Sequence, residues 1–238
     1  MEVVVKNVAL LCLLLFAMPG RKQSPSAVAA PPSGGDLEAV LAQMDRASSS
    51  FKALQADFEW DNYQKVVDET EKQKGQVSFH RKGNDVEAMF DITAPAAKQV
   101  LFKDGKLSLY NPKIDQITEY DPGKSKSDVQ AFLSLGFGAR GHELLKSYEV
   151  KMAGWETVDA VKTAKLELTA LSPKVRSMFS QFVLWIDPQR DVPIRQQVME
   201  PAGDYWLSHY TGFKLNGKIS EDVFHIQTTP HTKTVKPQ

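Results

Sequence analysis

The feature that most constrains the fold of this chain is an alternation of apolar and polar residues with a period of two. It appears first in residues 54–60, where every second side chain is apolar and those between are polar. This alternation is typical of a β-strand with one face buried and the other in water. Similar short runs follow at residues 77–79, 86–92, 100–102, 107–109, 117, 165–171, 178–187, 192–199 and 205–213. Because turn residues such as Asp104-Gly105 separate the runs, they predict about ten strands joined largely by hairpins.

Two segments replace this alternation with a helical pattern. In residues 36–51, apolar side chains recur at helical spacing, and Asp36 stands where an N-cap is expected. The second segment is an insertion in which Ser127 and Gln130 form a capping box, and the glycines of residues 136–141 end it. A further short helix is predicted at residues 143–148. One leading helix, a helical insertion and a meander of strands predict an antiparallel α+β fold.

The N-terminal residues 1–29 are predicted to be a signal peptide that directs export of the chain. Residues 8–18 form an uncharged apolar run that is too short for a bilayer span of about 20 residues, and Ala27-Val28-Ala29 provides a cleavage site. An uncleaved membrane anchor is the alternative. After it, residues 30–35 are predicted to be a linker, residues 36–230 one domain, and residues 231–238 a polar tail without structure.

Charge and motifs argue against several classes of function. Lys plus Arg number 29 and Asp plus Glu number 29, so the chain lacks the basic character of a nucleic-acid binder. A single cysteine, Cys12, excludes a disulfide framework and a Cys-rich zinc site. The five histidines show no metal-ligand spacing, so no metal and no cofactor are expected.

Catalytic motifs are weak in this sequence. Residues 136–141 match G-x-G-x-x-G, but a helix rather than a strand is expected before them, so a glycine-rich break between helices is the better interpretation. Residues 49–52 match S-x-x-K without the companion motifs of that enzyme class. A pair of carboxylates that meets only in space stays open. The sequence therefore predicts a protein that is not an enzyme.

Four elements, in order, resemble the periplasmic outer-membrane lipoprotein carrier family, the LolA-like proteins. They are FKALQADFEW (51–60), GQVSFHRKGNDVEAMFD (75–91), PAAKQVLFKDGKLSLYNPKIDQITEYD (95–121) and WIDPQRDVPIRQQV (185–198). The resemblance implies a curved, incomplete antiparallel β-barrel of about ten to eleven strands, closed by helices around a hydrophobic cavity. Residues 178–187 fit this picture because they are apolar at both parities, although an ordinary sandwiched core strand would be so too.

The strand parity and the resemblance together suggest which residues form a site. Those expected to line a lipid-binding cavity are Phe58, Trp60, Phe79, Phe90, Leu101, Phe182 and Leu184. Arg81 shares the parity of Val77 and Phe79, so it is predicted to point the same way. In the family this arginine bonds the lid helices and holds the empty cavity shut, which implies a gate role for Arg81. An arginine that merely reaches water at a strand end is the alternative.

The resemblance also implies a function. It is that of a periplasmic carrier or chaperone, which binds the acyl chains of lipoproteins and delivers them toward the outer membrane. Its partners would be the acylated cargo, an inner-membrane release complex and an outer-membrane acceptor, and the protein is expected to be a monomer. The alternatives are a lipid or glycolipid binding protein or an envelope sensor of the same fold, and a structural module with a fully packed core.

Overall fold

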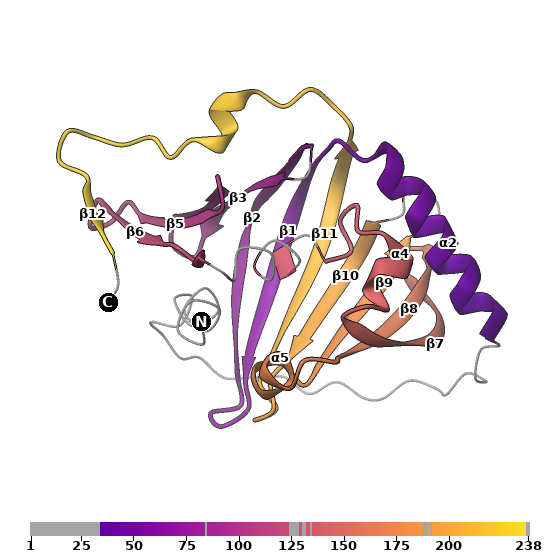
Figure 1. Ribbon diagram of the computed structural model, residues 1–238. Helices are drawn as coiled ribbons and strands as arrows, with labels where there is room; N and C mark the ends of the chain where they lie inside the picture. The colour runs from indigo at the N-terminus through magenta and orange to yellow at the C-terminus, as the bar shows by residue number, and fades with distance from the viewer. Residues whose placement is uncertain are drawn as a thin grey trace.

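The described strands of this protein form one curved sheet that does not close on itself (Figure 1). The computed structural model describes residues 34–83, 85–123, 129, 132–133, 135–187, 190 and 192–236. The strands are β1 (Ala53–Gln64), β2 (Glu69–Lys82), β3 (Asp85–Ala94), β4 (Lys98–Lys103), β5 (Lys106–Asn111), β6 (Gln116–Tyr120), β7 (Tyr148–Val158), β8 (Val161–Ala170), β9 (Gln181–Asp187), β10 (Val192–Met199), β11 (Tyr205–Leu215) and β12 (Lys233–Val235).

The strand order shows how the sheet is assembled. It is β12-β6-β5-β4-β3-β2-β1-β11-β10-β9-β8-β7, with 12 strands in all. Neighbours pair antiparallel except β12 and β6, which are parallel. The predicted α+β fold with an incomplete antiparallel barrel is therefore confirmed. The predicted hairpin at residues 103–106 is also present, since Asp104 and Gly105 both adopt positive φ, as a type I′ turn requires.

The α-helices lie against one face of this sheet, which we call the inner face. The longest, α2 (Gly34–Ser50), packs Val40, Leu41 and Met44 into a core cluster with the inner side chains of β8 and β9. It begins at Gly34, two residues before the predicted start and within the predicted linker, so Asp36 lies in the first turn and is not the N-cap. The short helices are α4 (Gly141–Leu144), α5 (Pro173–Met178) and the 3-10 helix η2 (Glu221–Phe224). In Figure 1, α2 and α4 lie over the half of the sheet that contains β7–β10.

Strand β9 is buried on both faces. Phe182 and Leu184 point to the inner face and join the cluster with α2. Val183 and Trp185 point to the outer face and pack with Ile194 in a smaller cluster. The strand is therefore apolar at every position because its inner side chains belong to a large core and its outer side chains to a small one.

Several predicted boundaries are wrong, and each error has a local cause. Strand β7 was not predicted because a bulge between Met152 and Gly154 interrupts its alternation. The predicted helix at residues 143–148 is instead α4, which ends at Leu144, followed by a turn into β7. The predicted strand at residues 178–187 begins only at Gln181, since Met178 ends α5.

The C-terminal segment is more structured than the sequence suggested. After β11 it forms η2, in which the fully buried Phe224 stacks on His80, with ring centroids 5.8 Å apart, on the outer face of β2. It then ends in β12, which lies within the predicted unstructured tail and pairs with β6. The predicted signal peptide, and the capping box of Ser127 and Gln130, lie outside the described residues.

Candidate functional site

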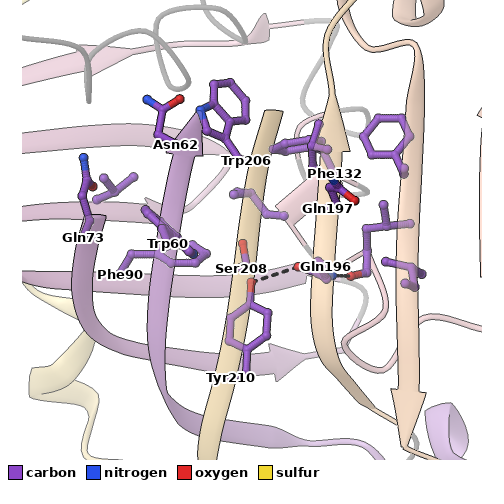
Figure 2. A pocket seen from close by; sticks show the side chains of 16 residues that line it. Trp60, Asn62, Gln73, Phe90, Phe132, Gln196, Gln197, Trp206, Ser208 and Tyr210 are labelled. Atoms are coloured by element: carbon purple, nitrogen blue, oxygen red, sulfur yellow. Dashed lines mark hydrogen bonds between the residues drawn. The ribbon is translucent and has the colours of Figure 1, made fainter. Parts of the chain in front are cut away.

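A cavity of about 140 Å³ lies on the inner face, between the sheet and the helical insertion (Figure 2). Strands from both halves of the sheet contribute to its wall, because β1 and β11 pair at the centre of the strand order. Its surface is mostly apolar. The described lining residues are Trp60, Asn62, Gln73, Phe90, Val100, Phe132, Leu133, Leu135, Phe182, Leu184, Gln196, Gln197, Val198, Trp206, Ser208 and Tyr210.

The register of the strands brings the aromatic part of this wall together. Trp60 lies opposite Ser208 of β11 and Gln73 of β2, on the inner face. The Trp60 ring stacks on Phe58 with centroids 4.2 Å apart and lies 5.5 Å from the Phe90 ring. Aromatic rings at these separations attract each other beyond the burial of their surface. The ring system therefore gives the cavity a firm aromatic side.

The insertion between β6 and β7 closes the other side of the cavity. Its Phe132, Leu133 and Leu135 are among the lining residues. Phe132 also stacks on Phe179, with ring centroids 5.5 Å apart. Further along, Phe137 stacks on Phe79 with centroids 4.9 Å apart. The insertion thus fills one part of the inner face and covers an empty space in another.

A short chain of hydrogen bonds fixes the polar residues at the cavity wall. The Tyr210 hydroxyl donates to Gln196 Oε1 at 2.9 Å, and Gln196 Nε2 donates to the carbonyl oxygen of Leu135 in the insertion (Figure 2). Burial raises the pKa of Tyr210 to about 12, so the phenol stays neutral at physiological pH. This chain ties β11 and β10 to the insertion without placing a charge in the cavity.

Arg81 joins the insertion to the long helix in an arrangement that we call the latch. Its Nη1 donates to the carbonyl oxygen of Ser48 at 3.1 Å, and its Nη2 donates to the carbonyl oxygen of Gly138 at 2.7 Å. Ser48 Oγ donates to the same Gly138 carbonyl at 2.7 Å. The guanidinium lies 5.3 Å from the centroid of the Phe51 ring. Burial, and next the positive charge of Arg140, lower the pKa of Arg81.

Gly138 can hold this position only as glycine. Its φ is +63°, in the left-handed region that residues with a Cβ rarely adopt. A Cβ at this position would also lie 2.5 Å from the Phe51 ring. The predicted glycine-rich break is thus a turn in which the backbone approaches α2 closely enough to bond Arg81 and Ser48.

The structure brings four of the predicted cavity residues together at the wall: Trp60, Phe90, Phe182 and Leu184. Phe58 and Phe79 do not line this cavity, because they are 2% and 1% exposed within the packed core. Leu101 does not line it either, because it pairs with Met89 and so points to the outer face. Its neighbour Val100, at the other parity, lines the cavity instead.

About half of the lining residues that the sequence analysis missed are polar. Asn62 and Gln73 continue the inner-face parity of β1 and β2, and Ser208 does the same on β11. A polar side chain gives no sign that it faces a cavity, so only the strand parity could have identified these residues. The same parity places Trp206 on the inner face, two residues before Ser208.

Other kinds of site find no support in the described part of the chain. Within it, no group of three or more His, Cys, Asp or Glu side chains is arranged to hold a metal ion. No helix in those residues combines the length and the apolar character needed to cross a lipid bilayer.

Comparison with known proteins gives consistent results on fold and family. Among curated proteins, none matches the sequence significantly. An uncharacterized conserved protein from Thermus thermophilus superposes with a TM-score of 0.55 at 10% identity, covering 85% of this chain and 99% of that one. MucB superposes with a TM-score of 0.53 at 14% identity over 82% of this chain, which spans 64% of the length of MucB. At such identities the similarity concerns the fold. Residues 49–227 match the family of the outer membrane lipoprotein carrier protein LolA, and the chain belongs to this family.

Proposed function

We propose that this protein carries acylated cargo, binding the acyl chains of lipoproteins in the cavity and delivering them toward the outer membrane. The observation that carries the proposal is an apolar cavity whose cover is held by hydrogen bonds, among them the pair made by Arg81. Membership of a family of lipoprotein carriers supports it. Burial of an acyl chain contributes about 0.8 kcal/mol per CH₂, so a cavity of this kind has ample driving force for binding.

The size of the cavity indicates that cargo binds only after the cover moves. Its volume is about 140 Å³. An engineered apolar cavity of about 150 Å³ is known to hold one benzene molecule, so this space is too small for a whole acyl chain. In the described arrangement, the cover and the sheet therefore leave too little room for such a chain. Loading requires the insertion to separate from the sheet.

Arg81 is placed to control that opening. Its two hydrogen bonds hold Gly138 of the insertion and Ser48 of α2 at the same time. Because Arg81 is only half-buried, its two hydrogen bonds together are expected to contribute about 1.5–3 kcal/mol, which favours a closed state that cargo binding can still overcome. Opening breaks both bonds, and release of the cargo restores them. We therefore propose Arg81 as the gate of the carrier.

The place of action and the partners are part of the same proposal. The apolar run at residues 8–18 and the family both support export to the periplasm. There, an inner-membrane release complex would load the carrier and an outer-membrane acceptor would unload it. N-terminal sequencing of the protein from its own envelope tests export and cleavage of the signal peptide, with Ala30 as the expected first residue.

Native mass spectrometry of the protein purified from its own envelope tests the cargo. A copurifying acylated protein is the expected result. A copurifying free lipid or glycolipid would instead support a lipid-binding protein of the same fold. A bare protein mass, together with no uptake of an added acyl probe, would overturn both and leave a structural module.

A further inference from the structure

One end of the cavity carries hydrogen-bond donors that an acyl chain alone does not use. Asn62 lies on β1 two residues beyond Trp60, toward the β1–β2 hairpin, and its side chain is 5% exposed. Its Nδ2 is buried and has no hydrogen-bond partner among the described residues. Trp60 Nε1 is buried too and lies near the Tyr210 hydroxyl, but it forms no hydrogen bond of normal geometry with the described residues. Figure 2 shows both side chains at the same side of the cavity.

Unpaired donors at this depth call for a partner. Buried polar groups in native proteins are nearly always hydrogen-bonded, and those that are not commonly await a ligand or water. The nearby Gln196 shows the contrast, because its amide is satisfied by Tyr210 and by the carbonyl of Leu135. Asn62 has no such internal partner among the described residues for its amide nitrogen. A ligand that completes this wall must therefore bring a hydrogen-bond acceptor.

The acceptor must also be neutral. None of the described lining residues is an aspartate, glutamate, lysine, arginine or histidine. A carboxylate placed here would be buried without a cation, which is strongly unfavourable, whereas a carbonyl oxygen needs only donors. The wall thus fits an acyl chain that ends in an ester or amide better than it fits a free fatty acid.

We propose that Asn62, together with Trp60 Nε1, recognises the neutral carbonyl that links an acyl chain to the rest of its carrier molecule. This inference rests on the proposed function, since it requires an acyl chain in the cavity. It adds selectivity to that function, because the site accepts acyl esters and amides and rejects fatty acids released by hydrolysis. The apolar wall holds the chain, and the two donors set how far the chain enters.

Three probes of equal chain length test this proposal on the whole protein. Dodecane, methyl laurate and laurate compete at pH 8 with a fluorescent acyl probe. In the Asn62→Leu variant, which keeps a similar side-chain volume, methyl laurate is expected to bind about 3- to 10-fold more weakly, as the loss of one or two neutral hydrogen bonds predicts. Dodecane, which accepts no hydrogen bond, should bind at least as tightly as it binds the wild type. The wild type should bind laurate more weakly than methyl laurate.

A matched control comes from the outer surface of the sheet. Gln76→Leu also replaces an amide by leucine, but Gln76 is exposed on β2 and bonds Asp57 there. This variant should bind all three probes like the wild type. If Asn62→Leu leaves the ratio of methyl laurate to dodecane affinity unchanged, carbonyl recognition is wrong although the cavity stands. If the wild type binds no probe, the proposed function falls, and this inference with it.

A measurement on the wild type covers the case in which Asn62→Leu does not fold. Methyl laurate labelled with ¹³C at the carbonyl is bound, and its infrared C=O band is recorded. Donation from an N–H group shifts this band to lower frequency than in an alkane. A band that stays at the alkane position would overturn the proposal, and a band that shifts would support it.

Discussion

The two ends of the inner face are built by the same strands, yet one is packed and the other is hollow. At the packed end, Phe58 and Phe79 are almost fully buried, and Phe137 fills the space above them. At the hollow end, Trp60 and Asn62 of the same strand β1 face a cavity. The parity of the strand is continuous, so what differs is the cover. The glycine turn brings Phe137 down onto the sheet, while the preceding part of the insertion bridges the space.

The largest test of this difference replaces one phenylalanine at each end. Phe79→Ala removes a ring packed on every side, and such changes typically cost about 3–5 kcal/mol of unfolding free energy. Phe90→Ala, at the border of the cavity, removes a ring that already lacks neighbours on one side. Phe90→Ala should therefore lower the unfolding free energy by at least about 1 kcal/mol less than Phe79→Ala does. Urea unfolding of both variants measures the difference, and equal losses would show that the two ends are packed alike.

The next test weakens the latch, which holds the insertion to α2. Arg81→Leu removes both latch hydrogen bonds, so stability should fall by about 1.5–3 kcal/mol and the open state should gain population. An apolar fluorescent probe should then enter faster, and cargo loaded on the variant should be handed on more slowly. Arg176→Leu, at an exposed position of α5, is the control. Probe entry and cargo transfer at wild-type rates would refute the gate.

The sequence predicts the parts of the fold that depend on local patterns, but not those that depend on contacts between distant residues. The period of two predicted the sheet, and the spacing in residues 36–51 predicted α2, because both patterns are local. Strand β7 escaped because of a bulge at Gly154, and β12 escaped because three exposed residues pair only with a distant edge. Leu101 shows that a run of consecutive apolar residues does not reveal its parity, which only the register with Met89 decides.

The candidate site was predictable only in part, for a related reason. Arg81 was expected to point inward with Phe79, and the structure gives it two backbone carbonyls there. Its partners, Ser48 and Gly138, lie 33 and 57 residues away in the chain, so no local pattern could identify them. The hollow itself is a property of the cover, and strand periodicity carries no information on whether a covering side chain reaches the sheet.

A smaller effect on stability is expected from alanine substitution at two glycines that share a φ angle but differ in their surroundings. Gly138 and Gly83 share a φ of +63°, but a Cβ would strike Phe51 at Gly138 and meet no atom within 4 Å at Gly83. Both alanine variants carry the same backbone penalty of about 1–2 kcal/mol. Gly138→Ala should lose roughly 1 kcal/mol more, through the clash at the latch, and should also admit the apolar probe faster. Thermal unfolding of the two variants measures the excess, and the absence of one would mean that the turn does not need close contact with α2.

The smallest expected effect is a dependence on pH that is confined to the covered end. His142 of α4 bonds Asp45 through Nδ1 and lies 3.1 Å from Glu38 through Nε2, so these two carboxylates of α2 hold the imidazole. The hydrogen bond to Asp45 raises the pKa of His142 above its ordinary value. A raised pKa in the folded state means that this contact is fully present below about pH 6.5 and is lost as pH rises through the folded-state value. The cavity wall, in contrast, has Tyr210 as its titrating side chain among the described residues, with a pKa of about 12.

Amide hydrogen exchange in α4 should therefore quicken between neutral and mildly alkaline pH, beyond the intrinsic change, while exchange at Trp60 and Ser208 should not. His142→Gln should abolish the difference, and a wild type whose α4 and cavity strands respond equally would show that the α2–α4 contact does not titrate in this range.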